Sequence, residues 1–303
     1  FLARHDANHP PEVDVNTYSG DAYLGIDAGS TTTKLTLIAP DGGPLYTYYQ
    51  SNRGDPVAVV LDQLKKIYAL CGSRIVIRGS AVTGYGEDLI KNAFGCDLGL
   101  VETMAHYNAG CGSFIETFAR ALGYEIAEFS RLGLFAKHPV NLGSRCTVFM
   151  NSSVKQAQKD GASVEDISAG LSISIVKNAV YKVIRAANAD DLGRHIVVQG
   201  GTFLNNAVLR AFEQELGRNV TRPTIAGLMG AFGAALAARD LGLERSALLD
   251  ARALEAFTHA AKPVTCNLCT NHCSLTVNQF DGGRRFISGN RCSRPLGKEK
   301  VEN

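Results

Sequence analysis

Alternating apolar and polar residues near the beginning of the chain predict a series of paired strands. An apolar run at residues 23–26 leads into Asp27, and Leu35 and Leu37 then alternate with polar neighbours. Period-two alternation of this kind is typical of strands with one buried face. The tripeptide Asp41-Gly42-Gly43 is typical of a tight turn, so we expect a further strand after it and paired strands from residue 23 to about residue 50.

Apolar residues spaced three and four positions apart predict several helices. The stretches are 57–69, 111–122, 163–187 and 205–216. The longest of them is apolar around most of its circumference, which favours a buried core helix without chemistry of its own. It begins at Ser163, with Asp166 three positions later, a pair typical of helix starts.

Glycine-rich segments follow two further apolar stretches. Residues 75–77 predict a short strand that leads into a turn at residues 79–86. Residues 196–202 predict a buried strand that ends in a Gly-Gly turn, where the backbone is either a plain tight turn or lets a ligand approach closely. Residues 227–235 predict a helix of small residues, which either packs tightly on another helix or contacts a ligand.

Size and composition limit the classes of function. At 303 residues and 45% apolar, the chain can bury a large core and is expected to form two lobes. Its 31 basic residues nearly balance its 29 acidic ones, so nucleic-acid binding has no electrostatic basis. We find no apolar run near 18 residues and expect no membrane span. The polar residues 1–22 are expected to be a linker from a preceding domain rather than a signal peptide.

The predicted turn between the first two strands carries the chemistry of a phosphate-binding hairpin. It places Gly29, Ser30 and Thr31 between Asp27 and Lys34. Backbone N–H groups and hydroxyls in such a turn bind phosphate oxygens, and Asp27 can hold a hydrated Mg²⁺ or orient a water molecule. The alternative is an ordinary hairpin whose threonines only complete the strand edges. No P-loop sequence is present.

Four of the eight cysteines lie close together near the C-terminus, at Cys266, Cys269, Cys273 and Cys292. A predicted hairpin at residues 275–287 returns the last of them to the others. Four thiolates suit Zn²⁺ or an iron–sulfur cluster, and His272 can replace one ligand; the alternative is four unrelated reduced thiols. Without an export signal or a small core-poor domain, the eight cysteines indicate a reduced, cytoplasmic protein rather than a disulfide framework.

These motifs together resemble the BadF/BadG/BcrA/BcrD ATPase family, which activates 2-hydroxyacyl-CoA dehydratases and benzoyl-CoA reductases. The similarity runs from about residue 23 to the C-terminus and is closest to the large multidomain members, which carry a similar cysteine-rich element. The motifs are residues 25–34, 82–86, 110–116, 143–149, 199–202 and 227–233.

The resemblance implies an α/β fold, the two-lobed actin-like ATPase fold of sugar kinases, actin and heat-shock chaperones, with a small cysteine-rich C-terminal element. It divides the chain into a linker (1–22), an ATPase domain (23–245), and a linker with the cysteine-rich element (246–303). It also implies ATP and Mg²⁺, with Asp27 as the catalytic residue. The implied ATP-binding residues are Gly29, Ser30, Thr31, Thr32, Lys34, Gly200, Gly201 and Thr202.

In this family a homodimer shares a [4Fe–4S] cluster and passes one low-potential electron to its partner enzyme. By resemblance Cys146 is a ligand of that cluster, and Cys111 is a candidate substitute for the second ligand. The implied electron donor is reduced ferredoxin or flavodoxin, and neither nucleic acid nor a membrane is an implied partner. In such a family an iron–sulfur cluster is favoured over zinc at the C-terminal cysteines.

The chain departs from the family pattern near residue 107. Residues 106–107 run directly into Asn108-Ala109-Gly110-Cys111, where the family has several dozen further residues with a second phosphate motif and the usual cluster cysteine. One phosphate hairpin cannot organise the transition state of hydrolysis by itself. Three functions therefore follow: an ATPase-type activator, a degenerate non-hydrolysing nucleotide- or metal-binding interaction module, and, less favoured, a small-molecule kinase on the same fold.

Overall fold

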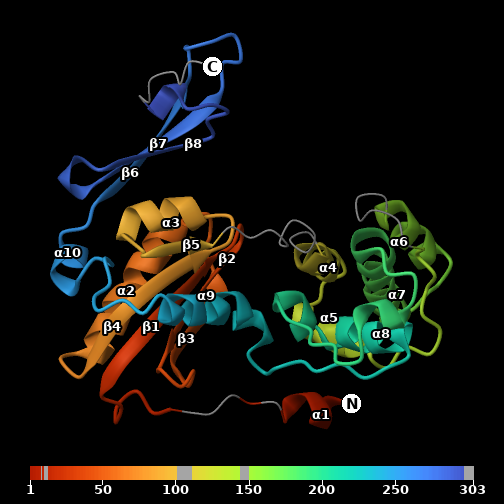
Figure 1. Cartoon of the computed structure of the whole chain (residues 1–303). Coiled ribbons are helices and arrows are strands. Elements are labelled where there is room, and N and C mark those ends of the chain that lie inside the picture. The colour runs from red at the N-terminus through yellow and green to blue at the C-terminus, as the bar shows by residue number, and fades with distance from the viewer. Residues whose placement is uncertain (8, 10–12, 101–110, 144–149, 297–303) are drawn as a thin grey trace. The chain divides into compact units, whose positions relative to one another are not determined.

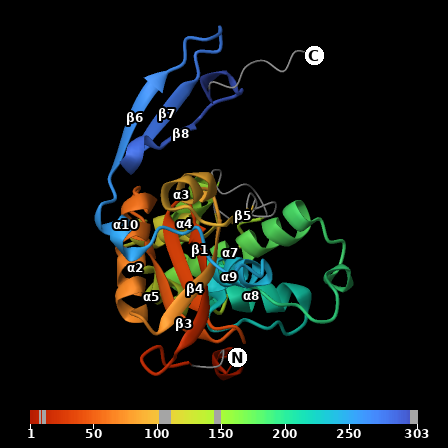
Figure 2. The ribbon, with the colours of Figure 1, turned by 60° about the vertical axis from the view of Figure 1, so that its left-hand side comes forward.

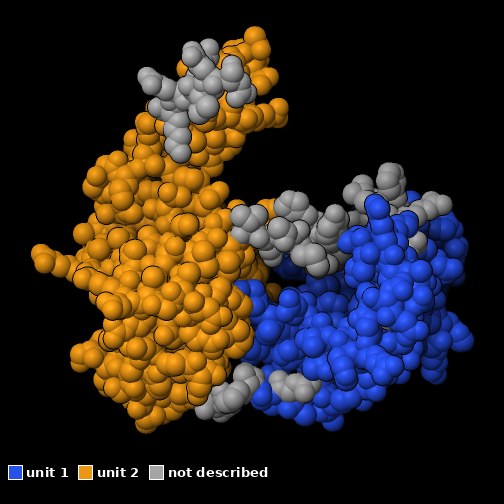
Figure 3. Space-filling view, viewed as in Figure 1, with its two compact units in different colours: residues 1–11, 102–230 blue, residues 12–101, 231–303 orange. Residues whose placement is uncertain are grey.

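The computed structural model describes residues 1–7, 9, 13–100, 111–143 and 150–296 (Figure 1). The chain divides into two compact units (Figure 3). Unit 1 contains residues 1–11 and 102–230, and unit 2 contains residues 12–101 and 231–303. Unit 2 is therefore built from two segments of the chain that are far apart in sequence.

A five-stranded sheet forms the centre of unit 2, with the order β3-β2-β1-β4-β5. The strands are β1 (Gly20–Ala28), β2 (Thr32–Ile38), β3 (Pro44–Ser51), β4 (Ile75–Thr83) and β5 (Leu98–Leu100). The first three strands pair antiparallel, whereas β4 runs parallel to both β1 and β5. The paired strands expected from residue 23 to about residue 50 are confirmed.

The two faces of this sheet are covered by different helices (Figures 1 and 2). Leu24 and Ile26 of β1 belong to the large core that also contains the apolar faces of α2 (Pro56–Cys71) and α3 (Glu87–Phe94). Gly25 faces the other side, where α9 (Met229–Asp240) packs so closely that a Cβ at Gly25 would lie 1.8 Å from the carbonyl oxygen of Ala231. Because successive residues of a strand alternate between faces, β1 is buried on both sides.

The C-terminal part of unit 2 is a short helix followed by a second, three-stranded antiparallel sheet. These elements are α10 (Ala251–Glu255), β6 (His259–Thr265), β7 (Ser274–Phe280) and β8 (Arg285–Ser288). The predicted hairpin is confirmed, with a short turn at Asp281–Gly283 between its strands. The Arg284 guanidinium beside this turn donates to the carbonyl oxygens of Asn92 and Ala93 at 3.1 and 3.0 Å, which attaches the turn to the α3 region.

The regular secondary structure of the described residues of unit 1 is helical, apart from one isolated bridge between Val197 and Thr221. Its α-helices are α1 (Leu2–Asp6), α4 (Cys111–Ala121), α5 (Ile126–Gly133), α6 (Met150–Lys159), α7 (Val164–Lys177) and α8 (Asn206–Leu216). Short 3₁₀ helices lie at Ala189–Leu192, Gly201–Leu204 and Ala226–Leu228, and two more, in unit 2, at Asp281–Gly283 and Arg294–Leu296. One apolar core joins residues of α4 to α8.

The long core helix expected at residues 163–187 is present but ends earlier. The Ser163 hydroxyl accepts the backbone N–H of Asp166, as the capping pair predicts, and α7 continues as a π-helix over Asn178–Ile184. Within the described part of the chain, Val164–Ile184 is the one helix whose length and mean hydropathy of 1.3 would suffice to cross a membrane. Of its most apolar window, 56% is buried inside the protein, as in a core helix.

Three sequence-based expectations about the elements are corrected. The strand at residues 75–77 extends to Thr83, so residues 79–83 are strand rather than turn, because β4 gains partners on both sides from β1 and β5. No strand forms at residues 196–202, where the described part of unit 1 offers no neighbouring strand and Val197 is 59% exposed. Finally, residues 2–6 of the expected linker form α1.

Candidate functional site

The hairpin between β1 and β2 carries most of the predicted ATP-binding residues. Its tight turn is closed by a hydrogen bond from the N–H of Gly29 to the carbonyl oxygen of Thr32, at 2.9 Å. Ser30 and Thr31 at the tip are exposed, whereas Thr32 is half-buried at the start of β2. The turn therefore presents hydroxyl and backbone N–H groups to solvent from a rigid pair of central strands. This donor set fits a phosphate group.

Asp27 and Lys34 form an ion pair across the base of this turn. They are register partners on β1 and β2, and the Lys34 Nζ lies 2.9 Å from the Asp27 Oδ2. Each side chain is only 13% exposed. Lys34 also lies over the ring of Tyr49, 5.7 Å from its centroid. The arrangement sets one partly buried cation and one partly buried carboxylate directly below the exposed donors.

Asn52 holds the turn from the neighbouring strand, and the sequence did not suggest this role. Its Nδ2 donates to the carbonyl oxygen of Gly29 at 2.9 Å, and its backbone N–H donates to the carbonyl oxygen of Thr31, also at 2.9 Å. The side chain is 3% exposed, and its Oδ1 accepts the N–H of Gly54. The Asn-x-Gly sequence just after a predicted strand was a usable signal for an ordered turn, but nothing in the sequence connected it to Gly29.

Gly84 lets the chain after β4 pass close to Asp27. It has a φ of 93°, and a Cβ there would lie 2.9 Å from the Asp27 Oδ1 and 2.7 Å from the carbonyl oxygen of Ala28. The N–H of Gly86 donates to that same carbonyl at 2.8 Å. The motif at residues 82–86 therefore supports the end of β1 from the side opposite β2.

The predicted Gly-Gly turn lies in unit 1. Gly200 has a φ of 94° and is exposed, with no atom within 4 Å of the position its Cβ would take. Its N–H donates to the carbonyl oxygen of Ala226 at 2.7 Å. Gly201 and Thr202 then begin the 3₁₀ helix that leads into α8, whose first turn is capped by the Asn205 side chain. A glycine is required at position 200 by its backbone, and the open space around it leaves room for a ligand.

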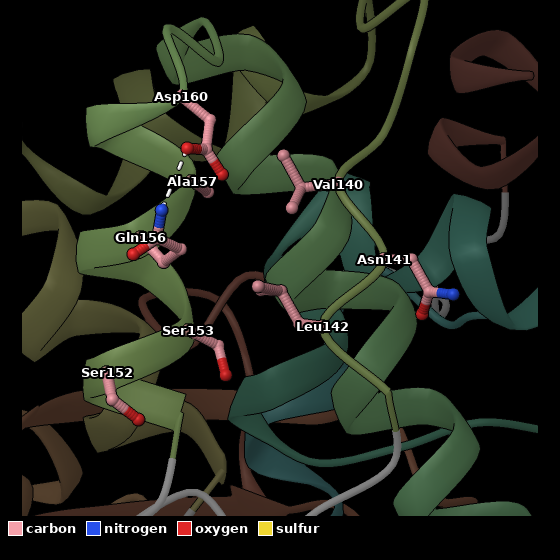
Figure 4. A pocket seen from close by; sticks show the side chains of 8 residues that line it. All are labelled: Val140, Asn141, Leu142, Ser152, Ser153, Gln156, Ala157 and Asp160. Carbon is pink, nitrogen blue, oxygen red and sulfur yellow. Dashed lines mark hydrogen bonds between the residues drawn. The ribbon is translucent and has the colours of Figure 1, made fainter.

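The structure describes little of the two cysteines that were predicted to bind the inter-subunit cluster. Cys146 lies outside the described residues, and Cys111 is the first residue of α4, with its side chain also outside them. An open surface hollow is lined by residues that precede and follow the segment containing Cys146, among them Leu142, Ser152 and Ser153 (Figure 4). Gln156 donates to Asp160 at 2.8 Å along one side of it. The chemistry of this hollow favours no particular ligand.

The C-terminal cysteines occupy one end of the β6–β8 sheet. Cys266 directly follows β6, Cys273 directly precedes β7, and Cys292 follows β8. Over the described residues, no three histidine, cysteine or acidic side chains are already gathered as metal ligands. In the core of unit 2, burial raises the pKa of the Cys71 thiol to about 11 and that of the Cys96 thiol to about 12.

Comparison with known proteins agrees with this arrangement. Residues 104–238 match the model of the BadF/BadG/BcrA/BcrD ATPase family. The chain is 27% identical over 256 residues to the 2-hydroxyisocaproyl-CoA dehydratase activator of Clostridioides difficile, an alignment that takes up 72% of this chain and 94% of the relative. The alignment has 256 positions, which is more than the 72% of this 303-residue chain that it includes, so some positions of the relative have no counterpart in this chain.

A second relative is the (R)-2-hydroxyglutaryl-CoA dehydratase activating ATPase of Acidaminococcus fermentans. It is 33% identical over 128 residues, which are 42% of this chain and 48% of the relative.

Two solved structures share the fold. The activator of the 2-hydroxyisocaproyl-CoA dehydratase from Clostridium difficile with bound ADPNP superposes with a TM-score of 0.60 at 24% identity, covering 73% of this chain and 95% of that one. Component A of the Acidaminococcus fermentans (R)-2-hydroxyglutaryl-CoA dehydratase gives a TM-score of 0.62 at 22% identity, covering 73% and 98%. The predicted α/β fold of the actin-like ATPase class is thereby confirmed, and over residues 104–238 the chain is similar to the BadF/BadG/BcrA/BcrD ATPase family.

Proposed function

We propose that this chain is an ATP-dependent activator of a 2-hydroxyacyl-CoA dehydratase or a related acyl-CoA reductase. The observation that carries the proposal is the β1–β2 hairpin, in which the exposed Ser30 and Thr31 of the turn lie above the partly buried pair of Asp27 and Lys34. The match of residues 104–238 to the family model and the activator names of the relatives support the same role.

The residues of the hairpin have distinct roles in holding ATP. The N–H groups and hydroxyls of Ser30 and Thr31 donate to phosphate oxygens, and the Lys34 ammonium adds a charge that is screened by little water. Asp27 is the carboxylate available for a Mg²⁺-bound water. Asn52 is a positioning residue, because it fixes the carbonyl oxygens of the turn and so the direction in which its N–H groups point.

Unit 1 contributes the remaining elements of the proposal. The Gly200-Gly201-Thr202 turn, which the family resemblance assigns to ATP, has the open backbone that such a role needs. Cys146, with Cys111 as the candidate second ligand, would hold a [4Fe–4S] cluster shared in a homodimer. Such a cluster supplies a low-potential electron when bound. Reduced ferredoxin or flavodoxin is the proposed donor, and the cytoplasm the proposed location.

A specific observation favours a second function, a non-hydrolysing nucleotide- or metal-binding module. The sequence lacks the second phosphate motif of the family, and the alignment to the dehydratase activator contains positions that this chain does not fill. A chain with one phosphate hairpin can bind a nucleotide without organising the transition state of its hydrolysis. The third function, a small-molecule kinase, rests on the fold alone.

Nucleotide titration tests the common part of the first two functions. We expect the folded chain to bind ATP, and Lys34→Met to weaken binding at least tenfold, equivalent to about 1.4 kcal/mol. The matched control is Lys66→Met, which removes an exposed lysine of unit 2 that pairs with Asp62 on the surface of α2. Equal affinities of the two variants would contradict the role given to the hairpin.

Turnover then separates the two functions. We would measure ATP hydrolysis by the anaerobically reconstituted chain and by the same chain with the family's missing segment restored near residue 107. Hydrolysis by the present chain supports the activator. Binding without hydrolysis, with turnover only after restoration, supports the non-hydrolysing module, and phosphorylation of a sugar or acid would support the kinase.

A further inference from the structure

The β6–β8 sheet has too little apolar core to hold itself together. Between residues 259 and 296 the buried side chains are Cys266, Leu275, Asn278 and Phe280. One of these is polar, and Phe280 packs on Phe257 at the base of the sheet, with ring centroids 6.0 Å apart. A folded element of fewer than about 40 residues usually needs a metal, a disulfide or a partner to be stable. Burial of apolar side chains therefore does not stabilise the end of this sheet that carries the cysteines.

The loop between β6 and β7 already forms a tight, ordered turn. The N–H of Cys266 donates to the carbonyl oxygen of Cys273 at 2.9 Å, which extends the strand pairing one step beyond Thr265 and Ser274. Within the loop, the N–H of His272 lies 3.4 Å from the carbonyl oxygen of Cys269. His272 has a φ of 42°, a conformation costly for a residue other than glycine. Cys266, Cys269 and Cys273 therefore lie in one compact turn. Because the backbone of His272 is strained, the conformation of this turn must be held by something other than the preference of its own sequence.

The segment after β8 returns the fourth cysteine to this turn. A Cβ at Gly289 would lie 2.5 Å from the carbonyl oxygen of Ser274, so the chain passes directly against the start of β7. Arg294 donates to the carbonyl oxygen of Leu268, inside the cysteine loop, at 3.3 Å. Cys292 lies between these two contacts, and its own carbonyl accepts from Asn290 at 3.0 Å. All four cysteines are therefore at the same end of the sheet, although among the described residues their thiols do not form a closed set of metal ligands.

We propose that Cys266, Cys269, Cys273 and Cys292 bind one tetrahedral Zn²⁺, which joins the β6–β7 loop to the segment after β8. A three-stranded antiparallel sheet with a Cys-x₂-Cys pair in a tight loop is the architecture of zinc ribbons. The Cys-x₂-Cys-x₃-Cys spacing lacks the first cysteine of the bacterial ferredoxin run, where this chain has Pro263, and it differs from the plant-type spacing. The four thiols are free, and Cys292 is exposed, so a metal can reach them. This zinc site is independent of the nucleotide function proposed above.

Zinc content of the full chain tests the proposal. Chain produced with zinc in the medium and passed over a weak chelating resin is expected to retain one zinc per chain, measured by inductively coupled plasma mass spectrometry. Replacement of zinc by Co²⁺ should give the visible spectrum of a tetrahedral thiolate site. Cys269→Ser and Cys292→Ser should each lower retained zinc at least tenfold. His272→Ala should keep it, since four thiolates complete the tetrahedron.

Cys71→Ala is the matched control, because it removes a buried thiol of unit 2 that belongs to the core around α2. It should retain zinc and the cobalt spectrum. Because circular dichroism and nucleotide binding report on the rest of the chain, they show whether a serine variant is folded elsewhere. Three results would overturn the proposal: no zinc in the folded wild-type chain, a Cys266–Cys273 disulfide in the native protein, or stoichiometric iron and sulfide that the same serine substitutions remove.

Discussion

The packing of α9 against β1 predicts a large penalty for adding a single methyl group at Gly25. A Cβ there would lie 1.8 Å from the carbonyl oxygen of Ala231 and 2.4 Å from the backbone nitrogen of Ala235. Both are backbone atoms of a helix, so no side-chain rotation can make room. To restore an ordinary contact of 3.4 Å from the present 1.8 Å, α9 must withdraw by about 1.6 Å, which weakens its dispersion contacts along the whole face.

The expected cost of Gly25→Ala is about 3 kcal/mol, at the upper end of the usual penalty for overpacking. The helix face that would separate from the sheet contains Ala231, Ala234, Ala235 and Ala238, each at most 1% exposed. Because β1, the strand that loses this packing, also carries Asp27, ATP affinity should fall in parallel.

Urea unfolding monitored by tyrosine fluorescence measures this penalty, because the chain has ten tyrosines and no tryptophan. A loss of about 3 kcal/mol should lower the midpoint of the unit 2 transition by roughly 1–3 M urea. The matched control is Gly233→Ala on the same helix, where no atom lies within 4 Å of the new Cβ. It should stabilise the protein by about 0.5–1 kcal/mol, the helical preference of alanine over glycine. Equal effects of the two substitutions would refute the packing argument.

Three further predictions concern single groups. In a double-mutant cycle, Asp27→Asn and Lys34→Met should show a coupling of about 1–3 kcal/mol in unfolding experiments, and additive losses would contradict a buried pair. Burial lowers the pKa of His5 below 6.5, and among the described residues its Nδ1 has no hydrogen-bond partner. The unfolded state therefore binds more protons than the folded state, so the free energy of unfolding should fall as the pH drops below 6.5. In urea titrations from pH 5 to 7.5, His5→Gln should make the free energy of unfolding less dependent on pH. Thiol labelling followed by mass spectrometry should find Cys71 and Cys96 unmodified in the native protein, because burial raises the pKa of their thiols to about 11 and about 12. If the native protein were labelled at these cysteines as rapidly as the protein in urea, the result would contradict their burial.

The elements that the sequence predicted well are those decided by local pattern. The helix at residues 57–69 was found as α2 because its apolar residues repeat with helical spacing and a buried face follows directly from that repeat. The hairpin through Asp27 was found because strand alternation and turn residues are both local signals. The tail hairpin at residues 275–287 was found for the same reason.

Features that depend on distant partners could not be predicted in this way. An apolar stretch at residues 196–198 satisfies the pattern of a strand, but a strand also needs a neighbour, and the described part of unit 1 supplies only one bridge, to Thr221. The polar segment that contains α1 was expected to be a linker, yet Arg4 reaches Glu213 at 2.6 Å and secures the helix to unit 1. Asn52 was missed as a site residue because its partner, Gly29, is remote in sequence.

The division of unit 2 into two chain segments has a consequence during synthesis on the ribosome. β1 emerges early, but α9, which covers the face with Gly25 and Gly79, follows only after all of unit 1. At ordinary translation speeds the roughly 200 intervening residues take about 10–40 s. Throughout that interval the nascent sheet has one uncovered apolar face, so unit 1 can complete its fold before unit 2, even though most strands of unit 2 are made earlier.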